Sequence, residues 1–192
     1  YAEITSPTVE SLIAKGDWNQ SLAMSRTLLG ALIAFLALAI VLCFFERALS
    51  ALHISAMAIT VFATLATFGA MGAPFGLPAL LGLCATAMTS LFTTLFYGAK
   101  LKEELYKGRT VKKAHVEASK KSLLPGLDIA IVAILIGVCV YALAGDVASK
   151  FGIVLILGGF FSLIADFLYI RIAGWLLCND STIADKFDRY LG

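Results

Sequence analysis

Long apolar segments separated by short polar connections dominate the sequence. Runs with few or no charged residues cover 27–45, 51–71, 77–99, 122–144 and 151–178. Each run is close to or longer than the roughly 20 residues that a helix needs to cross the hydrocarbon core of a membrane. Apolar and polar positions do not alternate within the runs, as they do in the strands of a membrane barrel. We therefore predict an all-α membrane protein with five transmembrane helices.

The composition supports this class of protein. Hydrophobic residues make up 60% of the 192 residues and charged residues only 15%, and the mean hydropathy is +0.90. Soluble domains usually carry about 25% charged residues. Residues 1–25 are more polar than the rest, and we expect them to be the end of an extracytoplasmic segment. Residues 26–192 are then the transmembrane domain.

Two carboxylates interrupt the apolar runs. Asp128 lies in the fourth run and Asp166 in the fifth. An ionised acid near the centre of a bilayer costs about 2.5–3.5 kcal/mol on insertion scales, and such residues usually line ion or proton paths. A short turn joins the two runs, so the helices should be antiparallel neighbours with both acids at a similar depth. We predict that Asp128, Asp166 and Arg171 take part in proton or ion coupling. The alternative is a structural role, in which the acids bond to hydroxyls, to the backbone or to Arg171.

The connection over 100–121 is the most basic part of the chain. Its basic residues outnumber Glu103, Glu104 and Glu117, and they are Lys100, Lys102, Lys107, Arg109, Lys112, Lys113, Lys120 and Lys121. Positively charged loops stay on the cytoplasmic side, so we predict a cytoplasmic C-terminus and an extracytoplasmic N-terminus. Gly108 should divide the connection into two helical halves. We expect this basic surface to contact anionic lipids or a partner protein.

Other chemistries lack support in the sequence. No pair among Cys43, Cys84, Cys139 and Cys178 has metal-binding spacing, and His53 and His115 are not part of a ligand-like cluster. No nucleophile–base pair or phosphate-binding loop is present. We therefore expect no enzymatic activity, no metal, no cofactor and no nucleic-acid partner.

A set of residues between Leu77 and Leu177 follows a pattern known from one family. The pattern comprises Leu77-Pro78, Lys102-Glu103-Glu104-Leu105, Gly108, Ala114, Glu117, Lys120-Lys121, Leu127-Asp128, Phe151, Gly158, Ser162 and Arg171. These residues resemble the transmembrane domain of SecD, a branch of the resistance–nodulation–division (RND) superfamily. The first helix also looks like the SecD helix that follows the large extracytoplasmic domain. The resemblance implies a six-helix domain of SecD/RND type, whose first helix would precede Tyr1 together with a soluble domain.

The resemblance also implies a role in a bacterial or archaeal cell membrane. SecD helps to move secreted proteins with energy from the proton gradient, so protons would be the coupling ion. The implied partners are a SecF-like subunit or half, the SecYEG channel and YidC. Unfolded secretory polypeptide would be the cargo, and membrane lipids would surround the helices.

The sequence departs from the family pattern at three places. The third helix of the family carries an acid that is thought to be the proton carrier, whereas this chain has Phe92. Asp166 stands where the family has a small apolar residue, and a Gly-Thr-Gly turn is replaced by a segment ending at Asp146. The loss of the third-helix acid keeps a non-pumping scaffold subunit as an alternative. A lipid or small-molecule exporter of the RND superfamily is a further alternative, but that branch lacks an acid at the position of Asp128.

Overall fold

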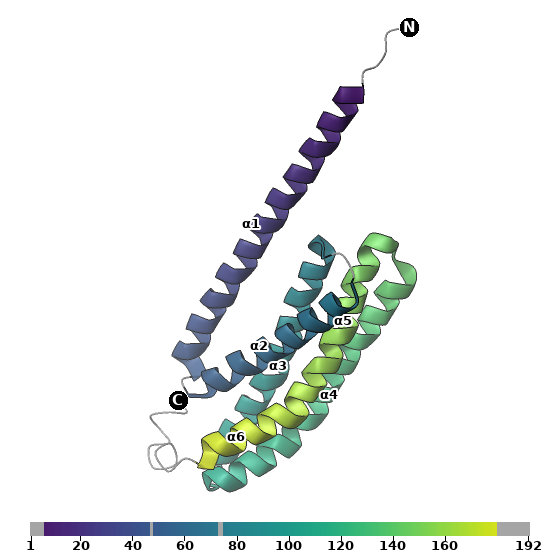
Figure 1. Cartoon of the computed structure of the whole chain (residues 1–192). Coiled ribbons are helices and arrows are strands. Elements are labelled where there is room, and N and C mark those ends of the chain that lie inside the picture. Colours follow the sequence, from purple (N-terminus) through teal and green to yellow (C-terminus); the bar gives the residue numbers. More distant parts are fainter. Residues whose placement is uncertain (1–5, 47, 73–74, 180–192) are drawn as a thin grey trace. The chain divides into compact units, whose positions relative to one another are not determined.

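The computed structural model describes residues 6–46, 48–72 and 75–179. Side chains are described from Ser25 onward, except those of Ala48, Asp146, Val147, Asp166 and 177–179. Every regular element in this part is helical (Figure 1). The elements are α1 (Ser6–Glu46), α2 (Ala48–Ala70), α3 (Leu77–Tyr106), α4 (Val111–Leu143), α5 (Asp146–Ile164), the π-helix η1 (Ala165–Tyr169) and α6 (Ile170–Asn179).

Five helical segments are long and apolar enough to cross a membrane. They are Ser25–Glu46, Leu49–Ala70, Leu77–Tyr106, Val111–Leu143 and Ala148–Leu176. The last one combines α5, η1 and most of α6. The prediction of an all-α membrane protein with five spanning helices is therefore confirmed.

The chain forms two units, Tyr1–Leu38 and Ala39–Gly192. In the first unit, the described residues belong to α1, which runs as one helix from the polar N-terminal segment into the first apolar run. The second unit contains the end of α1 and all later helices, and it holds the candidate functional residues.

The basic connection is a helical hairpin. Residues 100–106 extend α3 and residues 111–121 open α4. Gly108 lies between the two helices with φ of 78°, a left-handed conformation that glycine adopts at little steric cost. The glycine at this position therefore lets the chain reverse direction within four residues.

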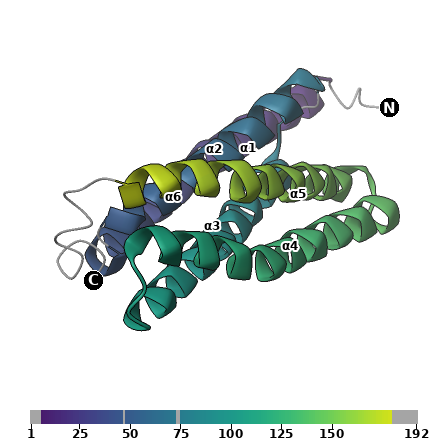
Figure 2. The same ribbon diagram turned by 90° about the horizontal axis from the view of Figure 1, so that it is seen from below.

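Small residues bring the helices of the second unit close together. α4 packs along α5, and α3 packs against both of them (Figures 1 and 2). A Cβ atom added to Gly137 of α4 would lie 2.9 Å from the carbonyl oxygen of Gly152 in α5. A Cβ atom on Gly152 would lie 2.7 Å from the carbonyl oxygen of Gly137. Reciprocal backbone contact of this kind is typical of helices that associate in lipid.

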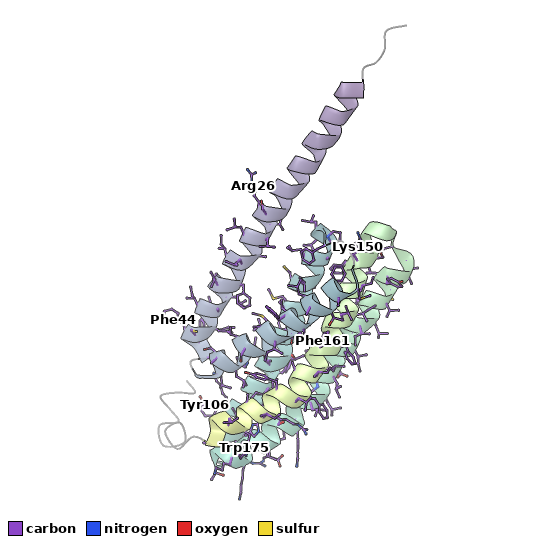
Figure 3. The ribbon with its side chains drawn as sticks, viewed as in Figure 1. Arg26, Phe44, Tyr106, Lys150, Phe161 and Trp175 are labelled. Carbon is purple, nitrogen blue, oxygen red and sulfur yellow. The ribbon has the colours of Figure 1, made fainter. Side chains whose placement is uncertain are left out.

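The ends of the helix bundle carry side chains that suit a membrane surface. Tyr106 at the end of α3 and Trp175 in α6 lie at one end, and Lys150 near the start of α5 lies at the opposite end (Figure 3). Tyr106 and Trp175 are both exposed. Amphipathic aromatic rings are enriched where the hydrocarbon core meets the headgroups, so the combined helix α5–η1–α6 extends from one interface to the other.

Candidate functional site

The interior of the second unit is lined by hydroxyl groups. Thr60 and Thr64 of α2 are completely buried, and so are Ser162 of α5 and several residues of α3, namely Thr86, Ser90 and Thr94. The outer surface is instead rich in exposed large apolar side chains. This distribution is the reverse of a soluble domain, and it is expected where lipid rather than water surrounds the helices.

Most of these hydroxyls are bonded within their own helix. Thr60 Oγ1 donates to the carbonyl of Ala56 at 2.9 Å, and Thr86 Oγ1 donates to that of Gly82 at 2.9 Å. A contact between helices joins Thr60 Oγ1 and Ser90 Oγ at 3.2 Å. One pair of hydroxyls therefore joins α2 to α3. A hydroxyl oxygen has two lone pairs, so it can accept a bond as well as donate one.

Asp166 belongs to the π-helix η1. The backbone N–H of Ile170 donates to the carbonyl of Ala165, five residues earlier. A π-helical turn inserts one additional residue into a helix and is frequent at functional sites. The side chain of Asp166 lies outside the described part of the structure. The backbone thus places this acid at the irregular turn of the fifth spanning segment.

Polar contacts also connect η1 with its surroundings. The hydroxyl of Tyr169 lies 2.5 Å from that of Ser55 on α2. A cavity of about 20 Å³ lies between α3, α4 and the η1 segment, and its lining includes Thr93, Ser119 and Phe167. This volume is enough for one water molecule, and the lining hydroxyls offer hydrogen-bond partners. A polar environment therefore reaches the π-helix from two sides.

Asp128 lies on the outer face of α4 and is exposed. The apolar side chains on the same helical face are also exposed, and they are Leu124, Ile131, Val132 and Leu135. Asp128 forms no hydrogen bond or ion pair with a described residue. The structure therefore does not place this acid against Arg171, and its surface is open to lipid or to a second protein.

Arg171 contacts Phe167 and His115 instead of Asp128. Its guanidinium carbon lies 4.9 Å from the centroid of the Phe167 ring, a cation–π geometry. Its backbone is bonded to His115, whose Nδ1 lies 2.7 Å from the Tyr97 hydroxyl. Sequence reasoning missed this link between α3, α4 and α6, because Tyr97 and His115 come together only when the hairpin closes.

Three residues of the predicted basic surface gather around Glu104. The side chain of Glu104 is completely buried, and its carboxylate lies 2.6 Å from Lys121, 3.1 Å from Lys107 and 3.1 Å from Arg109. Arg109 also approaches Glu117 at 3.6 Å. Sequence reasoning used Glu104 as a member of the family pattern and as a charge opposing the lysines, but it did not predict that this carboxylate holds the two arms of the hairpin together.

The remaining basic residues fall into two groups. Glu103 accepts hydrogen bonds at 2.6 Å from both Lys100 and Lys107, and hydrogen bonds to Glu103 and Glu104 raise the pKa of Lys107. Lys102 lies 3.1 Å from Glu46 at the end of α1. In contrast, Lys112, Lys113 and Lys120 are exposed and form no ion pair with a described residue. These three lysines are the part of the surface that stays available for an external anion.

No group of three His, Cys, Asp or Glu side chains converges within the described ranges as a metal site would require. His53 is another residue that sequence reasoning did not assign to a site. It is completely buried on α2, close to Glu46.

Comparisons with known proteins give a family match for this chain. The family model described as "Protein export membrane protein SecD/SecF, C-terminal" matches residues 11–177, which include most of α1 and nearly all of the later helices. No curated protein and no solved structure gives a significant match to the chain.

Proposed function

Because the chain belongs to the SecD/SecF family of protein-export membrane proteins, we propose that this multi-pass membrane protein is a SecD-like subunit. In this proposal it assists the translocation of secreted proteins alongside the SecY channel and draws energy from the proton gradient. No cofactor and no covalent step are part of the proposal, and protons are the coupling ion.

The observation that carries the coupling role is the π-helix at Asp166. A carboxylate within a spanning segment is costly unless it is neutralised or paired. Moving one elementary charge through a potential of 100 mV is worth about 2.3 kcal/mol, which is similar to that cost. An acid at this position therefore suits loading a proton on one side and releasing it on the other. The hydroxyl of Ser55 on α2 contacts Tyr169 of the same π-helix.

Asp128 supports the presence of a partner subunit. Its carboxylate lies on an exposed apolar face of α4, where lipid offers no hydrogen bond. A transmembrane helix with a basic or hydrogen-bond-donating side chain would satisfy it. We propose a SecF-like subunit or half as this partner, within an assembly that includes SecYEG and YidC. Unfolded secretory polypeptide is the proposed cargo.

The charge distribution supports the orientation of this subunit. The basic hairpin would lie at the cytoplasmic face of a bacterial or archaeal membrane. There the exposed Lys112, Lys113 and Lys120 would contact anionic lipid headgroups or a partner. The N-terminus of the chain would be extracytoplasmic and the C-terminus cytoplasmic.

The test is proton-gradient-dependent stimulation of secretion by the full-length protein in membrane vesicles. We expect Asp166→Asn to abolish the stimulation, because an amide cannot take up and release a proton. We expect Asp128→Asn to reduce it, because the contact with the partner helix is weakened. Both variants should accumulate in the membrane. Glu117→Gln is the matched control, since this partly exposed acid belongs to the hairpin and should retain stimulation. Unchanged stimulation in both aspartate variants would rule out the coupling role.

One observation favours a second function. In the resemblance to SecD, Phe92 stands where the third helix of the family carries an acid, and its side chain is exposed on α3. A non-pumping scaffold subunit would need no acid there. This alternative predicts that the Asp166→Asn protein still supports secretion, whereas loss of the whole chain does not. The RND lipid exporters are disfavoured, because Asp128 and the Lys120-Lys121 pair follow the SecD pattern.

A further inference from the structure

His53 is a buried histidine with no hydrogen-bond partner among the described residues. Its side chain is completely buried on α2, and neither Nδ1 nor Nε2 is bonded. A neutral imidazole has one N–H donor and one lone pair, and buried polar groups of this kind are normally satisfied. The neutral imidazole is therefore buried without a hydrogen bond from either ring nitrogen to a described residue.

The nearest charged groups come from two other helices. Glu46 Oε2, at the end of α1, lies 4.0 Å from His53 Nε2. The ammonium of Lys102, on α3, lies 3.1 Å from the same oxygen. This oxygen is itself buried without a well-directed hydrogen bond, so it can still accept one. Arg47, which follows Glu46 in the sequence, lies outside the described residues.

The space beside the ring is kept open by a glycine. A Cβ atom on Gly98 of α3 would lie 3.1 Å from His53 Nε2 and 3.7 Å from Glu46 Oε2. Any larger residue at this position would therefore crowd the space between the imidazole and the carboxylate. Gly98 leaves room for the small shift that would bring Nε2 and Oε2 to hydrogen-bonding distance.

We propose that His53 and Glu46 form a proton-binding site where α1, α2 and α3 meet, and that proton uptake transfers Glu46 from Lys102 to His53. A proton adds to the lone pair of the imidazole, and the resulting imidazolium donates an N–H to Glu46 Oε2. No covalent bond breaks. The ammonium of Lys102 is displaced toward solvent, which is feasible because its side chain is already 22% exposed.

The exchange has a structural consequence. With His53 neutral, the ion pair of Glu46 and Lys102 joins the end of α1 to α3. With His53 protonated, the pair of Glu46 and His53 joins the end of α1 to α2. The site is separate from Asp128 and Asp166, and its titration can be measured without secretion, so this inference does not depend on the proposed function.

The test is an NMR titration of the full-length protein in lipid nanodiscs, with histidine labelled at the ring nitrogens. The signal that disappears in His53→Gln identifies the residue. We expect Glu46→Gln to lower the pH at which His53 is half protonated by about one unit, because a nearby opposite charge is lost. We expect Lys102→Met to raise that pH by about one unit, because a like charge is lost. Lys112→Gln removes the same charge from an exposed position of α4 and should leave the midpoint unchanged.

Opposite shifts in the two variants would support the site. A His53 that stays neutral down to the lowest pH at which the protein remains folded would overturn the proposal. Equal midpoints in the wild type, Glu46→Gln and Lys102→Met would overturn it as well. If Glu46→Gln does not accumulate, the midpoint shift of Lys102→Met decides between these outcomes. This variant should fold, because Lys102 is partly exposed and the Glu46 carboxylate that it releases would pair with His53.

Discussion

At the scale of single residues, Asp128 and Asp166 have similar sequence surroundings but different places in the structure. Asp128 lies on an exposed apolar face of a regular helix. Asp166 belongs to a π-helical turn that hydroxyl groups approach from α2 and α4. A proton role for Asp128 therefore needs a second protein to supply its environment, whereas the π-helical turn that holds Asp166 is formed within this chain.

Gly174 gives a prediction at the same scale. A Cβ atom there would lie 2.7 Å from Tyr97 Oη and 2.9 Å from His115 Cε1. Overpacking of this kind costs about 1–3 kcal/mol, so Gly174→Ala should lower the melting temperature in detergent. Gly69→Ala is the matched control, because a Cβ atom at that position would meet no neighbouring side chain or helix within 4 Å and alanine favours the helix. Equal melting temperatures in the two variants would show that the contacts of Tyr97 and His115 adjust without cost.

At the scale of elements, the π-helix is the feature that most distinguishes the fifth spanning segment. The chain contains one residue more than a regular helix would need between α5 and α6. The sequence 165–169 shows no proline or glycine that would indicate the irregularity. α5 packs against α3 and α4, α6 packs against α4 and α2, and the additional residue lies between these two packed segments.

Removal of one residue from η1 tests its contribution. Deletion of Leu168, an exposed residue, should restore regular helical bonding while α5 and α6 keep their registers. We expect the protein to accumulate in the membrane but to lose gradient-dependent stimulation of secretion, because the turn that positions Asp166 is gone. Leu168→Ala keeps the length of η1 and should retain stimulation. Normal stimulation after the deletion would mean that the π-helix is dispensable.

At the scale of the whole molecule, the exposed face of α4 is the surface at which a partner helix would satisfy Asp128. A photo-crosslinking residue at Val132, one turn after Asp128, should attach to the proposed SecF-like subunit in the purified complex. The same residue at Phe62 on α2, which is also exposed and apolar, should attach mainly to lipid. Immunoblotting against the partner measures both products. Equal yields at the two positions would remove the argument for α4 as the interface.

Several parts of this arrangement could be predicted before the structure was known. The five spanning helices follow from apolar length alone, because a bilayer requires every backbone group to be bonded within the helix. The turn at Gly108 follows from one residue that tolerates a positive φ. The central role of Glu104 could not be predicted in this way, because Lys121 is 17 positions away and reaches it only in the folded hairpin.

The sequence by itself determined that this is a helical membrane protein with acids inside two of its spans, because hydrophobic length and charge are properties of local segments. Only the tertiary structure decided three further features. Asp128 faces outward, the fifth span becomes a π-helix at 165–169, and His53 lies beside Glu46. These features depend on how helices distant in sequence pack together, and the direction of a side chain is fixed only when its neighbours are in place.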